Sequence, residues 1–204
     1  MFGKVRLWLA GAILTATIGF VSMTTSSFAM GDKDLRPDVV KIADLFKKGD
    51  AAAAKKAAGP LGKEFKELGD LMNMFRTRKA AEGLGWGLKT PAGVPDEEDG
   101  HDKKIKLLIK ANADDAAKHP GNTEEAGFAL AALAELILAK TPDKFDDSKI
   151  KERTKKNWTD RSEEMRAASL ELAAAGKSKN GDAIIKSAKK VYGACNKCHD
   201  VFKD

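Results

Sequence analysis

Two cysteines and a histidine lie within five residues near the C-terminal end of this 204-residue chain, in the order Cys195-Asn196-Lys197-Cys198-His199. The chain contains no other cysteine. Two thiols and an imidazole in this order could form a disulfide, act as a redox dithiol, bind zinc, or hold a haem, because C-x-x-C-H is the attachment signature for c-type haem.

The spacing of the three residues favours haem. On a helix, residues three and four apart share a face, so Cys195, Cys198 and His199 would point the same way. The two thiols could then add to the haem vinyl groups as thioethers, with the imidazole beneath the iron. A thioredoxin-like dithiol would need a βαβ pattern, which the sequence lacks. A zinc site would need further ligands, and His101 and His119 stand alone. A disulfide leaves the histidine unexplained.

The N-terminus has the features of an export signal. Lys4 and Arg6 precede an apolar run from Leu7 to Val21, and small residues follow at Ser27 and Ala29. We therefore predict a signal peptide over residues 1–29, cleaved after Ala29, and a periplasmic or otherwise exported mature chain. The alternative is an uncleaved anchor, but the run is shorter than the ~20 residues that span a bilayer. No later stretch predicts a membrane span.

The composition favours helices and argues against nucleic acid as a partner. Alanine, leucine and lysine are abundant, and aromatic residues make up only 6%. The formal charge of +6 includes Lys4 and Arg6 of the signal peptide, which has no acidic residue, so the mature chain is +4. The lysines are spread along predicted helices beside carboxylates, which is typical of a solvated surface.

Apolar periodicity and capping residues predict an all-α mature domain, residues 30–204. Short helices are expected at 37–48 and 51–58, and longer ones at 60–78, 103–118, 122–140, 158–175 and 181–202. The long amphipathic helices predict an antiparallel four-helix bundle, with the short N-terminal helices added to it. The helix over 122–140 is apolar nearly all round and should be the most buried.

Glycines and prolines predict a long loop over residues 79–100. The glycines at 83, 85 and 87 do not match a nucleotide-binding fingerprint, since no strand precedes them. Trp86 in this loop could cover the edge of a haem, although an ordinary packed loop explains it more simply.

The chain resembles the class II cytochromes c, which include the cytochrome c′ group. The resemblance rests on Trp158, the turn Leu172–Gly176, and Ala194-Cys-x-x-Cys-His-x-x-Phe202 close to the C-terminus. It implies a four-helix bundle that carries one haem near the end of its last helix. It also suggests a homodimer formed through exposed helix faces.

The second axial position on the iron decides between functions. The resemblance implies either a methionine from an early helix or an open site that binds small gases. Met72 lies on the apolar stripe of 60–78 and ranks first, ahead of Met165 and of an open site. Met74 is expected to face solvent, on the same side as Arg78. Either inward methionine could instead be core filler. His101 and His119 lie at predicted helix ends, where histidine is more often a surface or capping residue than an iron ligand.

We therefore expect a single-electron carrier with His199 and Met72 as iron ligands. A five-coordinate gas-binding haem protein is the alternative. An enzyme such as a peroxidase is not expected, because no acid–base cluster accompanies the motif. The partners would be redox proteins, steered by a basic rim of Lys189, Lys190, Lys197 and Lys203.

Overall fold

The protein is all-α in the part of the chain that the structure describes. This computed structural model describes residues 34–78, 82–87, 99–142, 144–145 and 150–203. Its helices are α1 (Arg36–Lys47), α2 (Ala51–Glu64), α3 (Leu68–Asn73), α5 (His101–Lys110), α6 (Ala113–Ala116), α7 (Pro120–Ala139), α8 (Lys155–Ser178) and α9 (Gly181–Phe202). The composition therefore predicted the secondary-structure class correctly. The predicted signal peptide lies outside the described residues.

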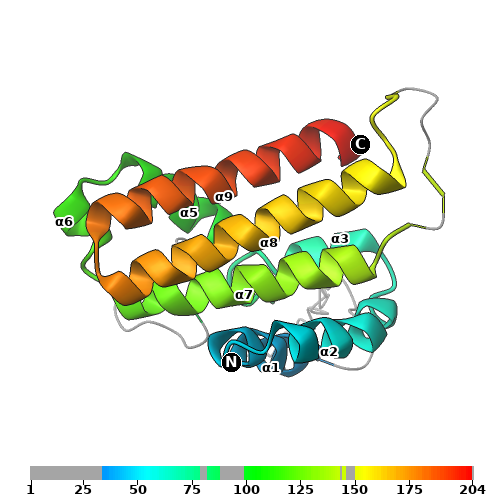
Figure 1. Ribbon diagram of the computed structural model, residues 1–204, viewed down its shortest axis with the longest axis horizontal. Helices are drawn as coiled ribbons and strands as arrows, with labels where there is room; N and C mark the ends of the chain where they lie inside the picture. Colours follow the sequence, from blue (N-terminus) through cyan, green and yellow to red (C-terminus); the bar gives the residue numbers. More distant parts are fainter. Residues whose placement is uncertain (1–33, 79–81, 88–98, 143, 146–149, 204) are drawn as a thin grey trace, which may run out of the picture.

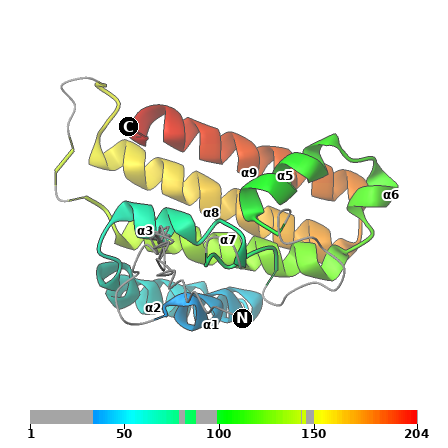
Figure 2. The ribbon, with the colours of Figure 1, turned by 180° about the vertical axis from the view of Figure 1, so that it is seen from behind.

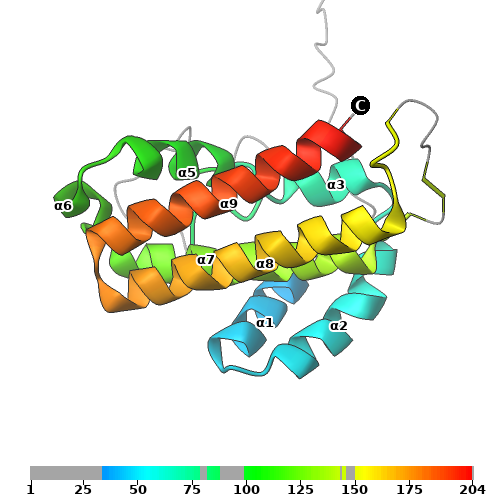
Figure 3. The same ribbon diagram turned by 45° about the horizontal axis from the view of Figure 1, so that its top comes forward.

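Three long helices run side by side through the molecule (Figure 1). α7 packs against α8, and α8 packs against α9. α1 and α2 pack against α7, and they lie on its side away from α9 (Figure 3). α5 and α6 pack against α9, while α3 contacts α7. Seen from behind, α3 and α5 follow one another along the molecule beside the long helices (Figure 2). None of the described helices is both long and apolar enough to cross a membrane.

α7 is the most buried helix, as its sequence predicted. Leu130, Leu133 and Leu136 are fully buried, as are most of the alanines between them. Helices approach this helix from several sides, because α1 and α2 cover the part that α8 leaves free. An apolar surface on every side is what such a position requires.

α8 presents its predicted apolar residues to the core. Trp158, Met165 and Leu172 are all buried. The prediction that the helix ends at Gly176 is wrong, because α8 continues to Ser178 and the left-handed residue that ends it is Lys179. Gly176 serves close packing instead: a Cβ there would lie 2.4 Å from the backbone nitrogen of Glu124 in α7.

α9 has the bounds that the sequence predicted. Asn180 caps its start, where its side chain accepts a hydrogen bond of 2.9 Å from the backbone N–H of Ala183. Ile184, Ala188 and Val191 are buried, and Cys195, Cys198 and Phe202 continue the same stripe as half-buried residues. The last helix therefore carries the two cysteines of the motif along its inward stripe.

The helix predicted over 60–78 does not exist as one element. Pro60 lies inside α2, and the chain leaves the helix at Phe65, whose ψ is 124°. The ammonium group of Lys140 donates to the carbonyl oxygen of Phe65 and also to that of Lys66. These bonds satisfy carbonyls at the end of α2, so the helix can stop there and a new one, α3, begins at Leu68.

The helix predicted over 103–118 is likewise divided. α5 begins earlier, at His101, and α6 follows after Ala111 and Asn112. The Asn112 side chain accepts a hydrogen bond of 2.8 Å from the backbone N–H of Asp115. This local bond caps a new helix, and it competes with continuation of the old one.

The close contact between α7 and α8 leads to a test of the fold. A Cβ at Gly127 would lie 2.4 Å from the backbone nitrogen of Ala173, whereas nothing lies within 4 Å of a Cβ at Gly193 in α9. We expect Gly127→Ala to lower the free energy of unfolding by about 1–3 kcal/mol through overpacking. The matched Gly193→Ala should raise it by about 0.5–1 kcal/mol, because alanine favours a helix interior. Denaturant unfolding followed by circular dichroism measures both, and equal stabilities would contradict the packing.

Candidate haem attachment site

The C-x-x-C-H motif lies in the last two turns of α9. Cys195 and Cys198 are half-buried free thiols, and His199 is exposed. Because the helix is continuous through the motif, the three side chains share one face at the predicted spacing. The structure therefore places together the three residues that the sequence singled out.

Aromatic rings hold this end of α9 against the neighbouring helices. Phe202 meets Trp158 of α8 edge-on, with ring centroids 5.1 Å apart, and Phe145 contacts both rings. The Trp158 indole donates a hydrogen bond of 3.0 Å to the carbonyl oxygen of Ile137 in α7. This cluster connects α7, α8 and α9 just beyond the motif, and it fixes where the motif lies along α8.

Arg153 secures the C-terminus of the same helix. Its Nε donates a hydrogen bond of 2.8 Å to the carbonyl oxygen of Val201, which has no partner within the helix. A positive charge at this end also complements the helix dipole. The backbone around His199 is thus held by a bond from outside its own helix.

Charged residues of α8 face the motif. Glu164 accepts hydrogen bonds from Lys197, which lies between the two cysteines, and from Arg161. The bond from Lys197 is the main cause that lowers the pKa of Glu164. Arg161 also lies close enough to Cys198 for its charge to act on that thiol, and its Nε is buried with no hydrogen-bond partner in the described structure.

The acid–base state of the motif does not suit a redox dithiol. Burial raises the pKa of Cys195 to about 11 and also raises the pKa of Cys198, so both thiols are protonated at neutral pH. A reactive dithiol needs a lowered pKa instead. Burial lowers the pKa of His199, which favours the neutral imidazole that binds metals. Among the described residues no group of three or more His, Cys, Asp or Glu side chains could hold a metal ion.

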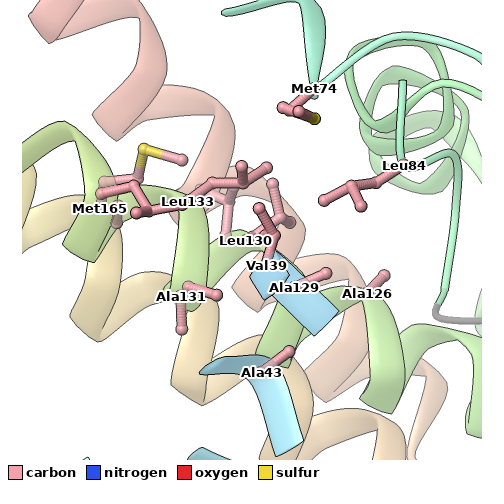
Figure 4. Packing of buried hydrophobic residues seen from close by; sticks show 14 of the residues in the cluster. Val39, Ala43, Met74, Leu84, Ala126, Ala129, Leu130, Ala131, Leu133 and Met165 are labelled. Atoms are coloured by element: carbon pink, nitrogen blue, oxygen red, sulfur yellow. The ribbon is translucent and has the colours of Figure 1, made fainter. Parts of the chain in front are cut away.

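Of the three methionines considered as ligands or neighbours, only Met74 is placed differently from the prediction. Met72 is half-buried on α3 and packs against the core, and Met165 is buried on α8. Met74, which we expected to face solvent, is fully buried. Figure 4 shows Met74 and Met165 among the side chains of the buried core. The break after Phe65 shifts the helical phase, so Met74 turns inward.

His101 is the main site feature that sequence reasoning missed. We expected a surface or capping residue at a helix end, but its side chain is fully buried at the start of α5. Its ring lies 5.7 Å from that of Trp86 and 6.3 Å from that of Phe75, measured between centroids. Both ring nitrogens lack a hydrogen-bond partner in the described part of the chain. An unsatisfied buried polar group costs about 1–3 kcal/mol. His119, by contrast, is exposed.

A partly buried ion pair lies near His101. Arg78 donates to both carboxylate oxygens of Asp99, over 2.9 and 3.0 Å, and to the carbonyl oxygen of Gly87 over 2.7 Å. Asp99 also accepts a hydrogen bond of 2.9 Å from the backbone N–H of Trp86. Trp86 is therefore a packed loop residue. Arg78 was expected to face solvent, but its guanidinium group is bonded within the protein.

Comparisons of the chain with protein-family models, with curated proteins and with solved structures found no match. The resemblance to the class II cytochromes c, and every residue role that it implies, therefore stays a prediction.

The buried His101 predicts a pH-dependent stability. Burial, together with a smaller effect of the charge of Arg78, lowers the pKa of this histidine from 6.5 to about 3. Below pH 6.5 the unfolded chain takes up a proton that the native protein does not, so stability falls as the pH falls toward 3. The loss should approach about 1.4 kcal/mol per pH unit.

Chemical unfolding at pH 7 and pH 5 measures this dependence. His101→Phe should flatten it, while His119→Phe, at an exposed histidine, should keep the wild-type slope. Equal slopes for His101→Phe and the wild type would show that His101 is not buried in the neutral form.

Proposed function

We propose that this protein is an exported c-type cytochrome that carries one covalently bound haem and transfers single electrons between redox partner proteins. The observation that carries the proposal is the motif itself: Cys195, Cys198 and His199 lie on one face of α9, with the two cysteines half-buried and His199 exposed. Burial raises the pKa of both thiols, which does not suit dithiol chemistry.

The residues around the motif fit such a group. The sulfur atoms of Cys195 and Cys198 would each form a bond to a vinyl carbon, with the thiol proton passing to the other carbon, so that no oxidant is required. His199 would be an iron ligand. The unpartnered Nε–H of Arg161 is a buried donor that a haem propionate would satisfy. When bound, the haem supplies a one-electron couple, and the surrounding apolar side chains keep water away from it.

We also propose that the helices form the antiparallel four-helix bundle of the class II cytochromes c. α7, α8 and α9 would be three of its helices. α3 and α5 follow one another beside these helices, and together they would occupy the position of the fourth helix (Figures 2 and 3). α1 and α2 would be additions on the far side of α7.

The surface charge near the motif supports electrostatic steering of an acidic redox partner less strongly than the sequence suggested. Of the predicted basic rim, Lys197 is paired with Glu164 and Lys190 with Glu171. These pairs are exposed and contribute little to stability, but they neutralise part of the positive charge. Electrostatic steering of an acidic partner would then depend mainly on Lys189 and Lys203.

Covalent attachment is the first test. The full chain, with its leader, is expressed in a host that has haem-attachment machinery, and the purified protein is denatured on a gel and stained for haem. We expect the wild type to retain haem, and Cys195→Ser/Cys198→Ser to lose it, because no thioether can form. Asn196→Ala, at a variable position of the motif, is the matched control and should retain haem.

The visible spectrum then separates carrier from gas-binding protein. Sharp, split α and β bands on reduction would support six-coordinate iron and electron transfer. A broad reduced spectrum that changes when carbon monoxide is added would mean an open site, and would replace the carrier with the gas-binding alternative. A wild-type protein without covalent haem would refute the proposal.

A further inference from the structure

We infer that the imidazole of His101, rather than a methionine, is the second axial ligand of the haem iron, opposite His199. The inference rests on the proposed function, since it needs a haem attached at Cys195 and Cys198. It departs from the sequence-based ranking, in which Met72 came first and His101 was discounted.

The first support is the unsatisfied state of the ring. His101 is fully buried, and neither ring nitrogen has a hydrogen-bond partner in the described structure. Buried polar side chains nearly always have a partner, so an exception calls for an explanation. A neutral imidazole with a free nitrogen is the commonest metal ligand in proteins. Iron would supply the missing partner for one nitrogen.

The second support is the position of His101 along α9. α5 packs against α9, and a Cβ at Gly181, the first residue of α9, would meet the carbonyl oxygen of Ala113 just beyond α5. The two helices run in opposite directions (Figure 3). Ala113 follows the C-terminal end of α5 and lies against the start of α9, so the N-terminal end of α5 extends along α9 toward the motif. His101 is the first residue of α5 and therefore lies at this end.

The third support is how firmly the ring is placed. The backbone N–H of His101 donates a hydrogen bond of 2.9 Å to the carbonyl oxygen of Phe75, just after α3. Trp86 packs on the ring, and the partly buried pair of Arg78 and Asp99 holds Trp86 in turn. A metal-binding histidine is usually oriented by a hydrogen bond on its second ring nitrogen, whereas here the backbone bond and the aromatic packing hold the ring in place.

The methionines provide no comparable signal. A thioether has only a weak acceptor, so a buried Met165 or Met74 is satisfied by apolar packing alone. Met72 is half-buried against the same core. Each of the three is explained as core filler, whereas His101 is not. Ligation by two histidines also implies a lower reduction potential than ligation by histidine and methionine, because methionine raises the potential.

The experiment uses the purified holoprotein in four forms: wild type, His101→Ala, Met72→Leu and His119→Ala. Visible absorption and near-infrared magnetic circular dichroism report the iron ligands. We expect low-spin iron without the Met–iron charge-transfer band in the wild type, Met72→Leu and His119→Ala. His101→Ala should become high-spin, its reduced form should bind carbon monoxide, and added imidazole should restore the low-spin spectrum.

A Met–iron band in the wild type that Met72→Leu removes would overturn the inference, and so would a low-spin spectrum that His101→Ala leaves unchanged. A wild type that is already high-spin would overturn it as well. If His101→Ala does not fold, the near-infrared spectrum of the wild type decides alone, because two histidines and histidine with methionine give different bands. Absence of covalent haem on a stained gel would instead signal failure of the proposed function.

Discussion

The close approach of α7 and α8 is the contact on which the rest of the described structure depends. Neither Gly127 of α7 nor Gly176 of α8 has room for a Cβ, because each faces backbone atoms of the other helix. Helices this close lose little volume to voids and bury a long strip of alanines. α9 packs on α8, and α1 packs on α7, so the positions of α9 and α1 depend on how α7 and α8 pack together. A shift of α8 would displace Trp158 and with it the end of α9 that carries the motif.

Local sequence signals predicted the helices whose ends depend on their own residues. α9 starts at Asn180, which caps it directly, and the apolar stripe that follows has an unbroken period. The breaks in the other helices depend on distant groups. Lys140 satisfies carbonyls at Phe65 and Lys66, about 75 residues earlier in the chain. No pattern within residues 60–78 could show that such a partner exists, so the sequence predicted one helix where the structure has two.

The candidate site also has one part that follows from local sequence and another part that depends on distant residues. Cys195, Cys198 and His199 lie within one helical turn and a little more, so their common face follows from the spacing alone. The surroundings of His101 come from three segments: Phe75 after α3, Trp86 in the loop, and Asp99 before α5. Arg78 and Asp99 are 21 residues apart. A histidine beside glycines and aspartates looks like a surface residue until these partners are known, and this is why sequence reasoning discounted it.

The Arg78–Asp99 pair lies near a histidine that remains buried and neutral. A buried cation without a partner would be costly, but both carboxylate oxygens of Asp99 accept hydrogen bonds from one guanidinium nitrogen of Arg78 and so compensate its charge. Burial is the main cause that lowers the pKa of His101 and keeps the imidazole unprotonated, and the charge of Arg78 acts in the same direction. An apolar residue of similar size would avoid the desolvation penalty altogether. The chain instead retains a polar ring, packs it against an aromatic side chain that a partly buried ion pair holds, and leaves both ring nitrogens without a partner among the described residues. A role in which the ring binds a group from outside the chain accounts for all three features at once.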